Sequence, residues 1–258
     1  SAKYRIHALA DQRLEAATAA AQETGASYAT ADVDRILDDD KVDAVFITTR
    51  HDSHADLSIR AAQAGKHILC EKPMGLNRDQ CRRVAEAVRR SGVKYTVGYN
   101  RGMAPLVVRA RELLASVPGS HKKLIYHRIQ APFAETHWTH DPQIGGGRFV
   151  GEGCHIFDLL CELVQARPVS VYAAGGTFLN PDVVRIPDSG IVTLAFEDGS
   201  VGTTLIASAG CKAFPKEATE IYCDHRTICI NDFREMEWCG FGEQPRETAR
   251  LDASDKGQ

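Results

Sequence analysis

The sequence of 258 residues carries 31 basic and 34 acidic side chains, a formal net charge of −3, and 43% hydrophobic residues. This balance provides no basic field for a nucleic acid, and no apolar run reaches the ~20 residues that span a bilayer. The length suits one large or two modest domains, and the start lacks a signal-peptide pattern, so we expect a cytoplasmic protein with no nucleic-acid or membrane partner.

Cysteine and histidine spacing argues against a metal centre. None of the eight cysteines forms a C-x-x-C pair, and most lie in apolar stretches, so we expect buried, reduced thiols. Two H-x-x-H pairs occur, His51 with His54 and His137 with His140. Neither has further ligands at the spacing of a structural zinc module, and we therefore predict no metal.

Residues 4–10 predict a strand that ends at Asp11, followed by an alanine-rich helix over 12–24. In a dinucleotide-binding fold, an acidic residue at such a strand tip accepts the adenosine ribose hydroxyls, which makes Asp11 a cofactor-binding candidate. A helix N-cap is the alternative role for Asp11. Arg13 leaves room for a 2′-phosphate, so NAD and NADP both stay open.

A glycine-rich phosphate turn is missing from the sequence. Dinucleotide-binding folds place a G-x-G-x-x-G turn directly after a central first strand, and the 258 residues contain no such turn. Omitting that strand would leave two interior strands with bare hydrogen-bonding edges. We therefore expect a preceding segment to supply the first strand and the turn.

Residues 42–73 predict a strand, a loop, a helix from His54 and a second strand that ends in Glu71-Lys72-Pro73. The apolar run at 42–49 is typical of a strand buried on both faces, and the whole reads as a βαβ unit. Ligands collect at the carboxyl ends of such strands. Because Lys72 precedes a proline, its ammonium can be directed to one place, which suits an alkoxide or a proton. A surface lysine in a turn is the alternative.

Further along, a helix from Asn77 and a strand over 93–98 bring Tyr99-Asn100-Arg101 to the same edge. A strand near Leu124 begins a second domain, so we predict domains over 1–121 and 122–258. The segment 131–147 reads as a loop whose His137 and Trp138 suit a sugar-like ligand, with a packed surface loop as the alternative.

A helix from Glu152 carries an apolar stripe, with His155, Asp158 and Glu162 on its flank. A histidine at a helix start can titrate near neutrality and exchange a proton with a hydroxyl, while a carboxylate one turn along orients it. A structural histidine is the alternative. Five later β-rich runs predict an open antiparallel sheet, and residues 240–258 predict a polar loop. The fold class is thus α/β, a Rossmann-like parallel sheet lacking its first strand, followed by an α+β domain with a mainly antiparallel sheet.

The motifs T-T-x-H-x-x-H, A-G-K-H and E-K-P, with VGYNRGMAP and GGGRFVGEGCHIFDLL, resemble the glucose-fructose oxidoreductase, inositol dehydrogenase and MocA (Gfo/Idh/MocA) family of NAD(P)-dependent oxidoreductases. The resemblance implies NAD or NADP as cofactor and Lys72 acting on the substrate oxygen. It places the loop from Thr48 to His54 near the nicotinamide. The cofactor-binding candidates are Asp11, Thr48, Thr49, His51, His54, Glu71, Lys72 and Asn100. The substrate-binding candidates are Arg101, His137 and Trp138.

The sequence departs from the family pattern at two places. The usual N-R-R is N-R-G, and Gly151 stands where the family has an aspartate. We therefore carry over His155 as general base, note that Asp158 matches, and regard Glu152 as a substitute acid. The family's sheet often forms a dimer interface, which implies a homo-oligomer. One branch is fused behind a zinc-type alcohol dehydrogenase-like module, which this chain resembles most.

The predicted function is hydride transfer between NAD(P) and a secondary alcohol or ketone of a sugar, nucleotide sugar or cyclitol, a small carbohydrate-like substrate. One alternative is a non-catalytic sugar- or partner-binding fragment of a longer enzyme. The other is redox-neutral elimination or epimerisation with recycled NAD.

Overall fold

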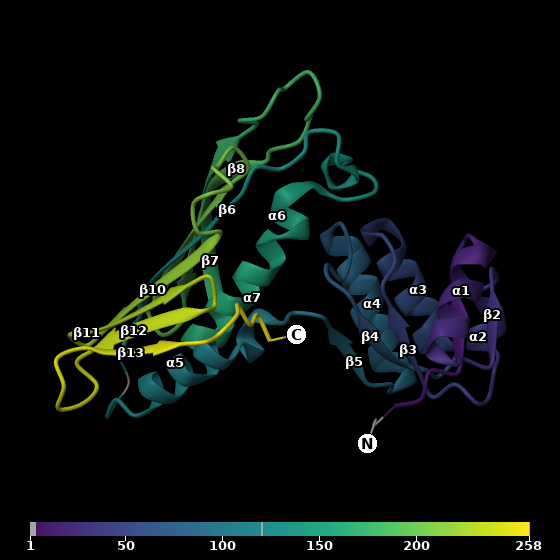
Figure 1. The fold of residues 1–258 in the computed structure, drawn as a ribbon, viewed down its shortest axis with the longest axis horizontal. Coiled ribbons are helices and arrows are strands. Elements are labelled where there is room, and N and C mark those ends of the chain that lie inside the picture. Colours follow the sequence, from purple (N-terminus) through teal and green to yellow (C-terminus); the bar gives the residue numbers. More distant parts are fainter. Residues whose placement is uncertain (1–3, 120, 258) are drawn as a thin grey trace. The chain divides into compact units, whose positions relative to one another are not determined.

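The computed structural model describes residues 4–119 and 121–257. The chain divides into two compact units, Ser1–Gly98 and Tyr99–Gln258, and each is described by itself (Figure 1). Residues 99–121, which the sequence analysis places in the first domain, group with the second unit in this division. The domain limits 1–121 and 122–258 stay a prediction.

The first unit alternates strands and helices. Its elements are β1 (Ala8–Ala10), α1 (Leu14–Thr24), β2 (Tyr28–Thr30), α2 (Asp34–Leu37), β3 (Ala44–Ile47), α3 (His51–Gln63), β4 (His67–Cys70), α4 (Arg78–Ser91) and β5 (Tyr95–Val97). In the described residues the strands form two parallel sheets, β1–β2 and β3–β4–β5. Parallel strands joined by helical crossovers are the Rossmann-like arrangement that the sequence predicts.

Local sequence explains where the helices of the first unit begin and end. The Asn77 side chain accepts a hydrogen bond from the Gln80 amide and starts α4. Gly25 and Gly92 end α1 and α4 in the left-handed conformation, with φ of 71° and 70°. On α3, Ala61 and Ala62 are buried beside Ile68 of β4, so small side chains let the helix lie close to the sheet.

Several expectations for the first unit are wrong in detail. The strand predicted over 4–10 is only Ala8–Ala10, and α3 begins at His51 instead of His54. The run 42–49 was expected to be buried on both faces, but the strand is Ala44–Ile47 and the Phe46 side chain is 57% exposed. The physical reason is that β3 is the terminal strand of its sheet.

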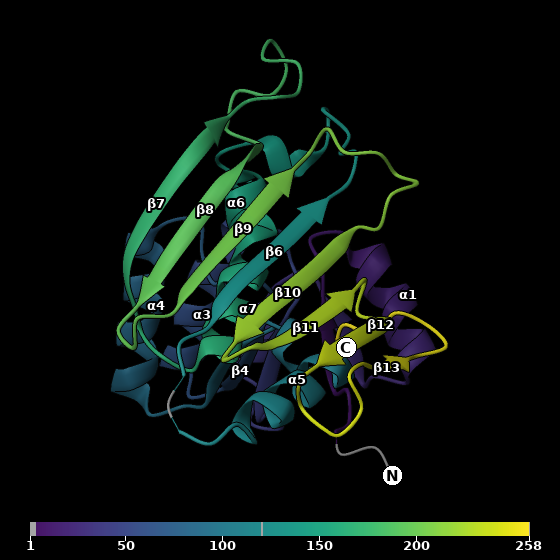
Figure 2. The same ribbon diagram turned by 90° about the vertical axis from the view of Figure 1, so that its left-hand side faces the viewer.

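The second unit pairs one large sheet with a layer of helices. Its elements are η1 (Arg101–Met103), α5 (Pro105–Ala115), β6 (Leu124–Gln130), η2 (Trp138–His140), α6 (Gly147–Gly151), α7 (Gly153–Val164), β7 (Pro168–Gly176), β8 (Ser189–Phe196), β9 (Val201–Ala207), β10 (Glu217–Cys223), β11 (Arg226–Asn231), β12 (Glu235–Cys239) and β13 (Glu247–Arg250). Among the described residues the strand order is β13-β12-β11-β10-β6-β9-β8-β7, antiparallel except for β6–β9. Figure 2 shows the helices behind one face of this sheet and the other face uncovered. The predicted fold class is confirmed.

The core of the second unit lies between α5, α7 and the sheet. Leu159 and Leu163 of α7 pack with Ile221 of β10 and Ile228 of β11. Because α7 is apolar along this stripe, it fixes its flank, which carries His155, relative to the sheet.

Some elements of the second unit were not predicted. Helix α6 was not predicted because its segment is rich in glycine. Strands β12 and β13 were also not predicted, and β13 lies within residues 240–258, which were expected to form a loop. Tight turns at Asp224-His225 and Asp232-Phe233 join β10 to β11 and β11 to β12, with φ between 47° and 58°.

Two further properties bear on the sequence predictions. The cysteines are free thiols, but only Cys70 and Cys223 are buried, and Cys211 is exposed, so the expectation of mostly buried thiols is wrong. Within the residues that the structure describes, no helix combines the length and apolar character that crossing a bilayer requires.

Candidate active site

In the first unit, a buried histidine connects the two loops that carry the motif residues. His54, on the first turn of α3, lies 2.7 Å from the Pro73 carbonyl through Nδ1 and 2.9 Å from the Thr49 carbonyl through Nε2. Carbonyl oxygens only accept, so both ring nitrogens can donate here only when the imidazole is in its doubly protonated, cationic form. Burial lowers the pKa of His54, but the hydrogen bonds with Cys70, Pro73 and Thr49 outweigh it and the net pKa is raised.

This engagement changes what we expect of His54. Both of its nitrogens bind the main chain of its own unit, so we assign it to positioning the Lys72-Pro73 turn instead of touching the cofactor directly. The Lys72–Pro73 peptide bond is cis. Thr49, which bonds the Ser53 hydroxyl at 2.6 Å, and the exposed Thr48 occupy the same loop.

Glu71 lies at the carboxyl end of β4. Its Oε2 accepts from the Lys72 amide at 3.3 Å. A Cβ at Gly98, just after β5, would stand 3.1 Å from Glu71 Oε1, so the glycine makes room for this carboxylate. The E-K-P motif therefore sits at the ligand side of the parallel sheet, as expected.

Asp11 follows the carboxyl end of β1, in the two-stranded sheet β1–β2. Its Oδ1 accepts from the Arg13 amide at 2.8 Å, while the N-cap of α1 is Arg13 itself. The N-cap role considered for Asp11 is thus not what the structure shows. The side chain is half-exposed, so its second oxygen suits a ribose hydroxyl.

NAD(P) fits this edge in part. Asp11 matches a ribose partner. Thr48 and Lys72 lie in the loops after β3 and β4, and His51 lies at the start of α3, where the family resemblance would place the nicotinamide. The glycine-rich turn that holds the pyrophosphate is absent from the 258 residues.

In the second unit, His155 lies on the first turn of α7. Its amide donates to the Glu152 carbonyl at 3.1 Å, and its ring meets the Tyr99 ring edge-on at 6.1 Å. One turn along, burial and then the charge of Glu162 raise the pKa of Asp158 to about 6. Asp158 is therefore partly protonated near neutral pH, where a proton-transfer partner is useful.

A buried ion-pair network stands beside α7. Arg101 donates to Glu217, with 3.4 Å from Nε to Oε2 and 3.2 Å from Nη2 to Oε1, and Lys256 also bonds Glu217. Burial raises the pKa of Glu217, but the charges of Arg101 and then Lys256 lower it by a larger amount, so that the net pKa is about 2. Arg101 Nη1 also donates to Asn100 Oδ1 at 2.9 Å. These bonds commit Arg101 and Asn100 to the network, and their predicted ligand contacts stay predictions.

Glu152 is the acid that this network positions. Its Oε2 lies 3.9 Å from Arg101 Nη2, and within the described chain this buried oxygen has no hydrogen-bond partner. Such an oxygen can accept a bond from a ligand. That Glu152 stands in for the aspartate replaced by Gly151 stays a prediction.

The N-R-G departure has a steric reason. A Cβ at Gly102 would lie 3.0 Å from the Glu162 Cγ, so a longer side chain at 102 would displace Glu162. Glu162 is itself held by Arg111, with 2.5 Å between Nη1 and Oε2.

The loop before α6 gathers aromatic and imidazole rings. The Phe133 ring lies 5.0 Å from the ring of His137 and 5.2 Å from that of His140, and His137 stands 5.5 Å from Trp138. The guanidinium of Arg148 lies 4.5 Å from the Phe133 centroid. Sequence reasoning named His137 and Trp138 but assigned no role to Arg148, although it stands in the motif GGGRFVGEGCHIFDLL. It also missed Glu217, because a single charged residue outside a motif carries no spacing signal.

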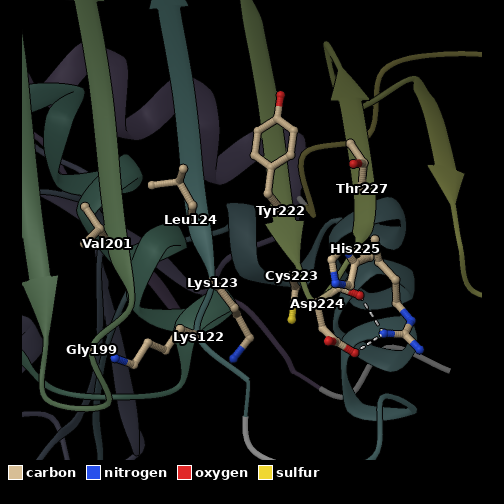
Figure 3. Close-up of a pocket in the computed structure, with 11 residues that line it drawn as sticks. Lys122, Lys123, Leu124, Gly199, Val201, Tyr222, Cys223, Asp224, His225 and Thr227 are labelled. Carbon is tan, nitrogen blue, oxygen red and sulfur yellow. Dashed lines mark hydrogen bonds and ion pairs between the residues drawn. The ribbon is translucent and has the colours of Figure 1, made fainter.

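A groove of about 540 Å³ lies elsewhere on the second unit, at the ends of β6, β9 and β10 (Figure 3). Its lining includes Lys122, Lys123 and Arg226, and Arg226 is paired with Asp224. None of the predicted site residues lines it, so we assign it no part in the chemistry. In the described part of the chain, no group of three or more His, Cys, Asp or Glu side chains could hold a metal ion.

Comparison with known proteins identifies the family. Residues 1–99 match the model "Oxidoreductase family, NAD-binding Rossmann fold", and residues 121–229 match "GFO/IDH/MocA C-terminal domain". The chain belongs to the Gfo/Idh/MocA oxidoreductases. The resemblance read from the motifs is thus confirmed.

Individual relatives agree with this assignment. The chain is 29% identical over 199 residues to the uncharacterized oxidoreductase YrbE of Bacillus subtilis, a match that covers 76% of this chain and 58% of YrbE. It is 30% identical over 189 residues to the scyllo-inositol 2-dehydrogenase (NAD⁺) of the same organism, covering 70% of this chain and 53% of the relative. The structure of levoglucosan dehydrogenase with NADH and levoglucosan superposes with a TM-score of 0.85 at 23% identity, over 97% of this chain and 73% of the other, which shows the shared fold.

This Gfo/Idh/MocA chain spans little more than half the length of these two curated relatives, 58% and 53%. The activity, substrates and partners of the whole protein are therefore matters for proposal.

Proposed function

We propose that the protein transfers hydride between NAD(P) and a secondary alcohol or ketone of a sugar, nucleotide sugar or cyclitol. The observation that carries the proposal is Lys72, placed at the carboxyl end of β4 in an NAD-binding fold and anchored through Pro73 by buried His54. Relatives named as scyllo-inositol and myo-inositol dehydrogenases support the substrate class.

The roles of the side chains follow from their chemistry. When bound, the nicotinamide supplies the hydride acceptor or donor. The ammonium of Lys72 stabilises the negative charge that develops on the substrate oxygen, where fixed charge accelerates the reaction most. His155 accepts the proton of the hydroxyl, and Glu152 and Asp158 are its acidic partners.

A fluorescence titration with NADH tests the proposal. We expect micromolar binding by the wild-type chain, retained in Lys72→Ala and His155→Asn, with oxidation of cyclitols reduced by about 10²–10⁴-fold in each. Lys94→Ala and His121→Asn, which change a lysine and a histidine outside the site in the same units, are matched controls and should retain activity.

Other outcomes would point to the alternatives. A folded chain that binds sugar but not NADH would support a binding module without catalysis. Turnover with tightly held cofactor and no net change in NADH would support elimination or epimerisation. Equal activity in Lys72→Ala and wild type would contradict the roles given above.

We also propose that the uncovered face of the large sheet joins two copies of the chain. The strand registers place exposed apolar side chains of four strands on this one face: Tyr172, Ile191, Leu124 and Tyr222. Light scattering should give about twice the chain mass of 28.2 kDa for the wild type and the single mass for Ile191→Glu. Phe178→Glu, outside the strands, is the control, and a monomeric wild type would contradict the proposal.

A further inference from the structure

Arg148 of α6 is a buried cation, and two of its hydrogen-bond donors have no acceptor. Its side chain is 1% exposed, and among the described residues Nε and Nη2 have no hydrogen-bond partner. One face of the guanidinium lies against the Phe133 ring. Burying a charged group without a partner is strongly unfavourable, so this arrangement indicates that Arg148 serves a group from outside the chain.

The position of the two nitrogens indicates which kind of group. Nε and Nη2 lie on one edge of the planar guanidinium, and their N–H bonds point the same way. Two parallel donors at this spacing match the two oxygens of a carboxylate. Two hydroxyls of a neutral sugar could also accept these bonds, but they bring no negative charge to oppose the buried guanidinium.

A second polar side chain beside Arg148 is in the same condition. His140 is 6% exposed, and neither of its ring nitrogens has a hydrogen-bond partner within the described chain. Its ring packs on the same Phe133, and Arg148 is among the charges that act on it. Two unsatisfied donors thus border one aromatic ring.

Two of the three carboxylates that act on Arg148 are committed elsewhere. Glu217 is held by Arg101 and Lys256. Asp188 accepts from the amides of Phe178 and Leu179 and from the Ser189 hydroxyl. The third, Glu152, lies 3.9 Å from Arg101, and its Oε2 makes no hydrogen bond within the described residues, to Arg148 or to any other group.

Charged side chains of both signs surround Arg148 and His140. Glu152, Asp188 and Glu217 act on Arg148, and Asp188 and Glu135 act on His140. His127 stays neutral near pH 7, since burial lowers its pKa to about 4. Because cations and carboxylates are both present, the case for a ligand rests on the unused Nε and Nη2 donors of Arg148.

We propose that Arg148, with His140 beside it, binds a carboxylate of the substrate, so that the protein acts on acidic sugars or acidic polyols. The proposal rests on the hydride-transfer function given above and specifies its substrate class. Arg148 precedes His155 by seven residues on consecutive helices, so the carboxylate and the reacting hydroxyl of one substrate address neighbouring segments.

Calorimetric titration without cofactor tests the inference. Sodium D-glucuronate, D-glucose and inorganic phosphate are compared at equal ionic strength. We expect glucuronate to bind at least tenfold more tightly than glucose and phosphate. Arg148→Met should lose this preference, and so should Arg148→Lys, which keeps the charge but loses the two-pronged edge and guards against a variant that merely fails to fold.

Arg128→Met is the matched control, because Arg128 also stacks on a phenylalanine, Phe214, at 4.7 Å, while its Nη1 donates to the Pro215 carbonyl. Its glucuronate affinity should equal that of the wild type. Equal binding of glucuronate and glucose by the wild type would overturn the inference, as would a preference for phosphate or a preference that survives in Arg148→Lys.

The failure of the inference and of the proposed function can be told apart. Glucuronate binding that depends on Arg148, in a chain that neither binds NADH nor turns over, would support the carboxylate site and refute hydride transfer. Oxidation of a neutral cyclitol with NAD(P)⁺, at a rate unchanged in Arg148→Met, would support hydride transfer and refute the carboxylate site.

Discussion

The guanidinium of Arg101 donates two hydrogen bonds to the carboxylate of Glu217, with 3.4 Å from Nε to Oε2 and 3.2 Å from Nη2 to Oε1. Residues 116 positions apart are thereby joined, one on the turn before α5 and the other at the start of β10. Because the same arginine lies 3.9 Å from Glu152, the pair also sets the place of the acid next to His155.

Replacing Glu217 by glutamine should lower the free energy of unfolding by about 3 kcal/mol, because two cations would lose their buried counter-charge. Urea unfolding at pH 7, followed by tryptophan fluorescence, measures this change, and both tryptophans, Trp138 and Trp238, belong to the second unit. Glu220→Gln, on the same strand but less buried, is the control, and an equal loss in both variants would contradict the prediction.

His127 should make the second unit less stable in mild acid. Burial lowers its pKa from 6.5 to about 4. Between pH 6.5 and pH 4, His127 is therefore protonated in the unfolded chain but neutral in the folded chain. Stability therefore falls as the pH drops from 6.5 towards 4, by up to about 3 kcal/mol. Unfolding curves at several pH values should show this slope in the wild type and a smaller one in His127→Gln. Identical slopes would refute it.

His54 should act in the opposite direction in the first unit. Its pKa is raised in the folded state, so its stabilising contribution is complete below pH 6.5 and is lost as the pH rises through the folded pKa. Hydrogen exchange of residues 48–58, compared between wild type and His54→Gln at each pH, isolates this effect from the intrinsic exchange rate. Protection should be greater in the wild type at low pH, and the difference should shrink as pH rises.

Gly102→Ala should cost about 1 kcal/mol, since its Cβ would crowd the Glu162 side chain. In a background of Glu162→Ala the same change should cost less than half as much. The difference between the two costs, a coupling energy from a double-mutant cycle, measures the contact. Additive costs would show that the crowding is not the cause.

The sequence predicted the parts of the fold that repeat a pattern. The β-rich runs became β7 to β11, and the E-K-P turn follows β4 as expected. Strand β12 had a usable signal, because Met236 and Trp238 alternate with glutamates and are buried. Strand β13, Glu-Thr-Ala-Arg, had none, since its pairing with β12 decides its structure.

The sequence predicted only part of the candidate site, because motifs are local and contacts are not. His155 and Lys72 stand in motifs, and motifs are local in sequence. The partner of Arg101 is 116 residues away and that of Lys256 is 39 residues away, so only the folded chain brings these charges together. Arg148 is unusual because it is buried without hydrogen-bond partners for Nε and Nη2, and this environment cannot be predicted from the sequence alone.

Phe233 sits in the turn between β11 and β12 with φ of 52°, a conformation that costs a bulky residue about 1–2 kcal/mol. Its ring is buried in the core with Met236 and Leu163. Glycine at this position would relax the backbone but remove the ring, and other aromatic residues would keep both the ring and the strain. Tolerance to substitution at this turn is therefore set by the interior of the protein, and a library screened at position 233 should retain aromatic residues where a consensus turn would favour glycine.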